Sequence, residues 1–180
     1  MKRNVFYLTG FMASGKSTIG PILANSLGWT FFDIDKEIIK KEGMKITEIF
    51  KLKGEDYFRT VENELLQLLS KKQNVIIALG GGTVTSEFNR EIIKSTGLMI
   101  YLKSSPEVAF KRLKFKRDRP ALLFEEDELP TEEKFIKRIN LLLEQRKEFY
   151  EQADYIINTD SLPVGKTVDK IVRIIENYLV

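Results

Sequence analysis

Residues 10–18 read Gly-Phe-Met-Ala-Ser-Gly-Lys-Ser-Thr and contain a complete G-x-x-x-x-G-K-[ST] pattern. An apolar run, Val5–Leu8, precedes the pattern, and a stretch with helical character, Thr18–Leu27, follows it. In such a strand–loop–helix unit the glycines allow a tight turn whose N–H groups converge on an anion, and the helix adds the partial positive charge of its N-terminus. The segment predicts a phosphate-binding loop for a nucleoside triphosphate, set in an α/β fold.

The side chains of this loop suit a bound triphosphate and its metal ion. Lys16 can reach the β- and γ-phosphates, and the Ser17 hydroxyl can ligate Mg²⁺. We therefore expect the nucleotide to contact Gly10, Ala13, Ser14, Gly15, Lys16, Ser17 and Thr18.

The lack of cysteine and histidine narrows the chemistry that this chain can perform. It excludes disulfides, thiol nucleophiles, zinc sites built on thiolate or imidazole, and a Ser-His-Asp triad. A general base must then be a carboxylate or, less favourably, a lysine or tyrosine. A metal ion must take oxygen ligands, which favours Mg²⁺.

Length and composition predict one globular domain spanning residues 1–180. No apolar run approaches the ~20 residues needed to cross a membrane, so we expect no membrane partner. Lys2 and Arg3 lead directly into the first apolar run, which is unlike a cleaved leader. The net charge of +3 is too small and diffuse to indicate nucleic acid.

Apolar runs alternate with amphipathic stretches along the chain. The predicted strands are Val5–Leu8, Thr30–Phe32, Val75–Leu79, Leu98–Leu102 and Tyr155–Ile157. The predicted helices are Lys16–Leu27, Asp35–Lys41, Ile46–Lys53, Gly54–Ser70, Ser86–Ser95, Pro106–Leu113, Thr131–Gln152 and Val164–Tyr178. This alternation predicts a five-stranded parallel sheet with helices on both faces, a three-layer α/β/α sandwich.

Two segments interrupt this rhythm. Residues 114–130 have mixed charge, contain Arg119-Pro120-Ala121-Leu122-Leu123 and show no clear period. A connection of this length is typically a functional lid or a disordered segment, and we favour a mobile lid. Gly80–Gly82 directly follows a predicted buried strand, where glycines let a ligand approach the backbone, although a plain turn is the alternative.

Two carboxylates, Asp33 and Asp35, follow the second predicted strand. Ligands of open α/β sheets bind at this edge, and alternate residues of an extended chain point the same way. Both carboxylates can therefore face the cleft, one toward Mg²⁺ and the other toward an acceptor hydroxyl. A role as helix N-cap is the alternative for one of them.

Arginine suits the bidentate recognition of carboxylate and phosphate groups. The candidates are Arg59, Arg112, Arg119 and Arg146. Each one taken singly is more often a solvated or helix-pairing side chain, and composition alone does not choose among them.

Taken together, these segments resemble the shikimate kinase family. The matching segments occur in the family's order and are Gly10–Gly20, Phe32–Asp35, Ile49–Phe50, Gly54–Glu62, Gly80–Val84, Arg119–Leu123, Arg146 with Tyr150, and Asn158–Asp160. The resemblance implies Mg²⁺-dependent transfer of the γ-phosphoryl group of ATP to the 3-hydroxyl of shikimate, on the pathway to chorismate and aromatic amino acids. It also implies a P-loop kinase fold of the nucleoside-monophosphate-kinase type, with a substrate-binding subregion at about 33–62 and a lid at about 114–130. A cytoplasmic monomer is expected on the same ground.

The same resemblance implies roles for individual residues. Asp35 would hold the acceptor hydroxyl and accept its proton, with Lys16 and Arg119 stabilising the transferring group. Ser17, with Asp33 acting through water, would form the Mg²⁺ site. Phe50 and Phe58 would line the pocket around the substrate ring. Shikimate would contact Asp35, Arg59, Gly80, Gly81, Gly82 and Arg146, and the nucleotide base would lie near Arg112 and the loop Thr159–Pro163, which includes Asp160.

Several departures from the family pattern leave alternatives open. Ala13 stands where many relatives have glycine, which is tolerable if the backbone there is not left-handed. Lys147-Glu148 stand where relatives commonly have a proline, and the spacing from Tyr150 to Asp154 is one residue short, so Arg138 is the alternative to Arg146.

Two other functions compete with the one that the resemblance implies. Another small-molecule kinase of the same fold, acting on gluconate or a nucleoside monophosphate, is the nearer one. A nucleotide switch is the more distant one, because the Asn-Lys-x-Asp and Asp-x-x-Gly elements typical of guanine-nucleotide switches do not occur in the sequence.

Overall fold

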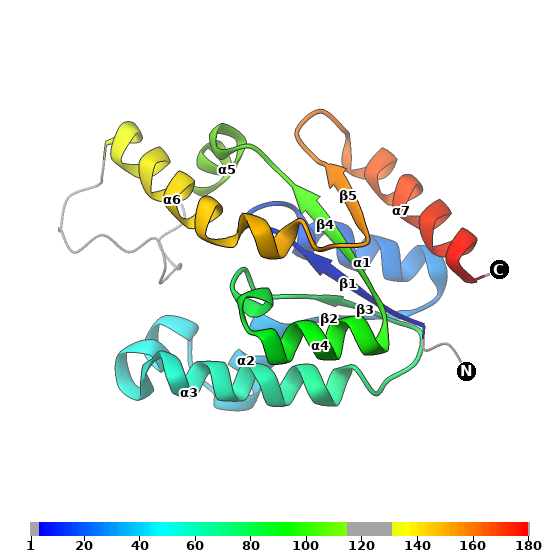
Figure 1. Ribbon diagram of the computed structural model, residues 1–180, viewed down its shortest axis with the longest axis horizontal. Coiled ribbons are helices and arrows are strands. Elements are labelled where there is room, and N and C mark those ends of the chain that lie inside the picture. The colour runs from blue at the N-terminus through cyan, green and yellow to red at the C-terminus, as the bar shows by residue number, and fades with distance from the viewer. Residues whose placement is uncertain (1–3, 115–130, 180) are drawn as a thin grey trace.

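A single parallel sheet organises the molecule, as the ribbon view shows (Figure 1). The computed structural model describes residues 4–114 and 131–179. The strand order is β2-β3-β1-β4-β5, and every neighbouring pair runs parallel. The strands are β1 (Val5–Thr9), β2 (Thr30–Asp33), β3 (Val75–Ala78), β4 (Leu98–Lys103) and β5 (Tyr155–Asn158). The predicted five-stranded parallel sheet is confirmed.

Helices cover both faces of the sheet, which confirms the predicted three-layer sandwich. They are α1 (Lys16–Leu27), α2 (Ile34–Glu42), α3 (Ile46–Leu69), α4 (Glu87–Thr96), α5 (Pro106–Leu113), α6 (Glu132–Tyr150) and α7 (Val164–Leu179), with a short 3₁₀ turn, η1 (Thr83–Thr85). Among the described residues, no helix is long and apolar enough to span a membrane.

The central strand shows how the two faces are filled. All five residues of β1 are buried, and successive side chains of a strand point to opposite faces. Val5 and Tyr7 pack in one apolar cluster with side chains of α2, α3 and α4. Phe6 and Leu8 pack in another with side chains of α1 and α7. A strand buried on both faces needs a continuous apolar run, which is why this strand does not alternate polar and apolar residues.

A third apolar cluster joins the phosphate-binding loop to α5 and α6. Phe11 of the loop packs there with Phe110 and Leu113 of α5 and with Phe135 and Ile139 of α6. The predicted lid, residues 114–130, lies outside the described residues except for Lys114, the C-cap of α5.

A kink at Gly54 divides α3 into the two helices that the sequence predicts. Gly54 has φ 83° and ψ 171°, which are non-helical angles open to glycine. The kink folds the two halves toward each other, and the rings of Phe50 and Phe58 meet across it with centroids 4.8 Å apart.

Gly97 lies where the chain enters β4, and its lack of a side chain sets how closely that strand approaches β1. A Cβ at Gly97 would lie 2.1 Å from the backbone oxygen of Val5. We therefore expect Gly97→Ala to lower the free energy of unfolding by about 1–3 kcal/mol, because backbone atoms must move to relieve the overlap. Denaturant unfolding followed by circular dichroism measures this change.

Gly165→Ala is the matched control. A Cβ there meets no atom of the described residues within 4 Å, and Gly165 is helical. Its stability should be unchanged or slightly raised. If both variants lost the same free energy of unfolding, the close approach at Gly97 would not be the cause of the destabilisation.

Candidate active site

A cavity of about 560 Å³ opens at the carboxyl edge of the sheet. This volume lies in the range of small-molecule sites. The phosphate-binding loop contributes one wall, and the segments after β2 and β3 together with α3 and α6 contribute the others. The predicted site residues that line the cavity are Ala13, Gly15, Lys16, Ser17, Thr18, Asp33, Asp35, Arg59, Gly80, Gly81, Gly82 and Arg146. The structure thus brings together residues that lie as much as 133 positions apart, from Ala13 to Arg146.

The phosphate-binding loop takes its shape from three residues with positive φ, namely Gly10 (142°), Ala13 (62°) and Gly15 (107°). Gly10 has no room for a side chain, because a Cβ would lie 2.5 Å from the oxygen of Leu102 in β4. We expected alanine at position 13 to be tolerable if the backbone there is not left-handed. The backbone of Ala13 is in the left-handed region, so this condition is not met. A non-glycine residue there costs about 1–2 kcal/mol, so the surrounding contacts must hold the alanine in place.

The Lys16 ammonium group is turned back onto the loop that carries it. It donates hydrogen bonds to the backbone oxygens of Gly10 (2.6 Å) and Phe11 (3.0 Å) and to the Ser14 hydroxyl (3.4 Å). The helix that follows starts at the left-handed Gly15, and no side chain of the described residues caps it. A helix N-terminus without a side-chain cap, with a lysine beside it, attracts phosphate oxygens.

Ser17 and Asp33 meet at the start of this helix. The Ser17 hydroxyl donates to Oδ2 of Asp33 at 2.6 Å, although the two residues come from α1 and β2. Oδ1 of Asp33 accepts from the backbone N–H of Lys36 at 3.4 Å, so the N-cap alternative holds for Asp33. Hydroxyl and carboxylate oxygens in one place match the preference of Mg²⁺. The described part of the chain contains no group of three or more acidic residues that could hold a metal ion.

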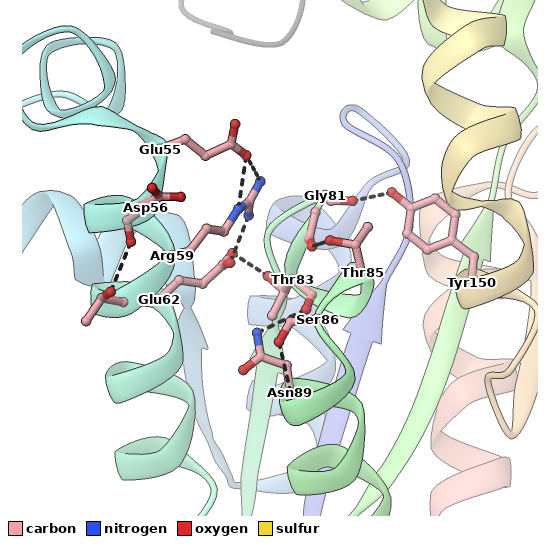
Figure 2. A network of polar contacts seen from close by, with 12 residues as sticks. Glu55, Asp56, Arg59, Glu62, Gly81, Thr83, Thr85, Ser86, Asn89 and Tyr150 are labelled. Atoms are coloured by element: carbon pink, nitrogen blue, oxygen red, sulfur yellow. Dashed lines mark hydrogen bonds and ion pairs between the residues drawn. The ribbon is translucent and has the colours of Figure 1, made fainter.

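Arg59 is held by two carboxylates of its own helix (Figure 2). Its Nη1 donates to Glu62 at 2.9 Å, and its Nε and Nη2 donate to Glu55 at 3.2 and 2.9 Å. Burial by itself lowers the pKa of Arg59, but the charges and hydrogen bonds of Glu62 and Glu55 together raise it above its ordinary value. The guanidinium therefore stays charged and oriented at the cavity wall.

Glu62 is a site residue that the sequence analysis did not identify as one. Its side chain is only 1% exposed, and a buried charge requires partners. Its second oxygen accepts from the Thr83 hydroxyl at 2.6 Å, and Asn89 in turn donates to the backbone oxygen of Thr83 at 3.0 Å (Figure 2). The signal available in the sequence was the spacing of three residues from Arg59, which places the two side chains on one helical face.

The three consecutive glycines make room for the charged side chains around them. A Cβ at Gly80 would lie 3.0 Å from Oδ1 of Asp35, and one at Gly82 would lie 2.8 Å from Nη2 of Arg59. A Cβ at Gly81 would lie 3.4 Å from Nη1 of Arg146. Side chains at Gly80 and Gly82 would overlap the groups that the resemblance assigns to the substrate.

Arg146 and Arg138 both line the cavity from α6. Arg146 is the one beside Gly81, whose backbone oxygen accepts a hydrogen bond from the Tyr150 hydroxyl at 2.5 Å. Arg146 of α6 thus lies beside the glycines, although Lys147 and Glu148 stand where relatives commonly have a proline.

The residues expected near the nucleotide base lie beside a second, smaller cavity of about 190 Å³. Arg112 lines it and bridges two loops, donating to the backbone oxygens of Ala13 (3.0 Å) and Thr159 (3.4 Å). Asp160 does not line this cavity. Its carboxylate accepts instead from the backbone N–H of Ser105, at 2.9 Å, which ties the loop after β5 to the start of α5. Arg119 lies outside the described residues.

Comparison with known proteins identifies the family to which this chain belongs. A family model described as shikimate kinase matches residues 12–176. A shikimate kinase of Chloroherpeton thalassium is 43% identical over 178 residues, which are 99% of this chain and 95% of that protein. One from Chlorobaculum parvum is 43% identical over 98% of this chain and 94% of its own length.

A solved structure extends the similarity to the backbone. A shikimate kinase from Acinetobacter baumannii in complex with shikimate has a TM-score of 0.88 at 34% identity, covering 97% of this chain and 93% of that one. The model match, the sequence identity and the shared fold each span nearly the whole chain. The chain belongs to the shikimate kinase family and is an ATP-dependent kinase.

Proposed function

We propose that this enzyme binds ATP and shikimate in the 560 Å³ cavity and transfers the γ-phosphoryl group to the 3-hydroxyl, giving shikimate 3-phosphate and ADP. The observation that carries this proposal is the meeting of Asp35, Arg59 and Arg146 at the three glycines, facing the phosphate-binding loop. Two guanidinium groups suit a substrate carboxylate, and a carboxylate suits a hydroxyl. The product would serve chorismate and aromatic amino acid biosynthesis.

The donor half of the site binds and orients the triphosphate. Its phosphates would lie on the loop residues Gly10, Ala13, Ser14, Gly15 and Thr18 and at the N-terminus of α1, where N–H groups and Lys16 meet their charge. Lys16 would exchange its bonds to loop oxygens for bonds to phosphate oxygens. Arg112 would lie at the base, beside the 190 Å³ cavity, with Asp160 holding the adjacent loop.

The acceptor half positions one hydroxyl for attack. Arg59 and Arg146 would fix the carboxylate of shikimate, and Phe50 and Phe58, which line the cavity, would pack on its ring. Asp35 would then orient the 3-hydroxyl and accept its proton. Phosphoryl transfer needs little covalent help, so this positioning and the charge stabilisation by Lys16 account for the catalysis. From the sequence we assign Arg119, and the lid that contains it, to the same transferring group.

Ser17 and Asp33 would hold Mg²⁺, with Asp33 acting through water. Their oxygens already meet at 2.6 Å beside the loop, and both are hard ligands. When bound, the ion would offset the negative charge of the phosphates. We further propose that the enzyme is a cytoplasmic monomer that uses neither nucleic acid nor membrane as a partner.

A coupled assay of ADP release tests the proposed acceptor. Shikimate should support turnover, whereas gluconate, AMP and CMP should not. AMP and CMP lack a carboxylate for Arg59 and Arg146, and gluconate has a carboxylate but lacks the ring that Phe50 and Phe58 would pack on. Turnover with gluconate or a nucleotide and none with shikimate would overturn the proposal.

Asp35→Asn should lower kcat by about 10²-fold or more, because the amide cannot accept the proton of the hydroxyl. Steady-state kinetics at saturating ATP and shikimate measures the effect. Glu37→Gln is the matched control, since it removes a carboxylate from the same first turn of α2 but does not line the cavity. Near-normal turnover of the Asp35 variant would reject this role.

Arg146→Ala should raise the KM for shikimate by about 10- to 100-fold and leave the KM for ATP nearly unchanged, because it removes a charge-assisted bond to the carboxylate. Arg138→Ala provides the comparison, since Arg138 lines the cavity from the same helix. A shikimate effect confined to the Arg138 variant would assign the carboxylate to Arg138 instead.

A further inference from the structure

We propose that the Tyr150 hydroxyl is a positioning group, which holds Arg146 and the Gly81–Gly82 peptide in the arrangement that receives the substrate carboxylate. Tyr150 is the last residue of α6 and has no exposed surface. It does not line the cavity, so it would act through the residues that do. The proposal deepens the proposed function and depends on it.

The hydroxyl contacts one group of the site and lies beside another. It donates its proton to the backbone oxygen of Gly81 at 2.5 Å, and Arg146 lies beside the same glycine, since a Cβ at Gly81 would be 3.8 Å from the Tyr150 hydroxyl and 3.4 Å from Nη1 of Arg146. The direction of the bond to Gly81 is fixed, because a carbonyl only accepts. A phenol suits this place, since its oxygen can also accept from a guanidinium.

The bond to Gly81 determines which way the next N–H group points. In a trans peptide the C=O and the following N–H point in opposite directions, and no peptide of the described residues is cis. Tyr150 holds the Gly81 oxygen, so the N–H of Gly82 must point away from Tyr150. Gly82 lies against the Arg59 guanidinium, the other proposed partner of the carboxylate.

The neighbouring carbonyls of the turn are held locally, which makes the contribution of Tyr150 distinct. The oxygen of Gly80 accepts from the Thr83 N–H at 3.2 Å, and that of Gly82 accepts from the Thr85 N–H at 3.1 Å and the Thr85 hydroxyl at 2.7 Å. Both threonines belong to the turn itself. Tyr150 lies 69 residues away on α6, the helix that also carries Arg146. Its hydroxyl therefore fixes the position of the turn relative to α6, and Figure 2 shows the bond between Tyr150 and Gly81 that joins them.

The ring and the hydroxyl of Tyr150 have separable roles. The ring stacks on Tyr101 of β4 at 5.1 Å and 24°, and both rings belong to the apolar cluster on this face of the sheet. Phenylalanine at position 150 keeps that packing and removes only the hydroxyl group. Burial raises the pKa of Tyr150 to about 12, although Arg146 lowers it in part, so the phenol remains a proton donor near neutral pH.

Tyr150→Phe should raise the KM for shikimate about tenfold while the KM for ATP stays within about twofold, because the lost bonds orient only the acceptor half. Tyr101→Phe is the matched control. It makes the same change in the ring stacked on Tyr150, and it should leave both KM values within about twofold. Steady-state kinetics of both variants, with thermal unfolding to compare their stability, measures these effects.

A second substrate separates positioning from general loosening of the structure. The carboxamide of shikimate lacks the charge that Arg146 and Arg59 would bind, so Tyr150→Phe should weaken its use less than that of shikimate. Replacing Tyr150 by 4-aminophenylalanine, which keeps an N–H donor to the Gly81 oxygen, should restore part of the affinity. That variant also provides the test if Tyr150→Phe does not fold.

Three results would overturn the proposal. They are an unchanged KM for shikimate in Tyr150→Phe, equal losses for shikimate and its carboxamide, and equal effects in the Tyr101 and Tyr150 variants. Failure of the proposed function is distinguishable from these, because the wild-type enzyme would then not phosphorylate shikimate at all.

Discussion

The parallel direction of the five strands is the constraint on which the site depends. Parallel strands deliver their carboxyl ends to one edge, where segments distant in sequence meet. The loop after β1, Asp33 at the end of β2, the glycines after β3 and the loop after β5 all reach this edge. Burial of β1 on both faces fixes the sheet between its helices, and this in turn fixes the distances between donor and acceptor groups.

The charged side chains of α3 at this edge are held in place by ion pairs with one another. Arg59 is bound by two carboxylates, and one of them, Glu62, is almost completely buried. Breaking a buried pair leaves an uncompensated charge, so such a pair keeps its geometry even where its net contribution to stability is small. The bond between Glu62 and Thr83 extends this geometry from α3 to the glycine turn. The substrate would thus meet groups whose positions are set before it arrives.

Local patterns in the sequence predicted most of the fold. Apolar runs located all five strands, and two helices were predicted that meet where α3 is kinked at Gly54. Asp33 and the glycines were identified because each directly follows a strand. The contact of Glu62 with Thr83 and that of Tyr150 with Gly81 span 21 and 69 residues, and local spacing does not encode such contacts. The backbone angle of Ala13 was also beyond prediction, because alanine by itself disfavours it and only the surrounding contacts impose it.

The unfavourable backbone of Ala13 has a consequence for how fast nucleotide can bind. The bond from Arg112 to its oxygen and the turn from Phe11 to Ser14 are both internal to the protein, so folding alone shapes the loop. The loop then loses its conformational entropy when the protein folds, so this loss does not lower the affinity for ATP. Association should accordingly proceed without a slow loop rearrangement, at a rate governed by diffusion and by the attraction between the triphosphate and Lys16.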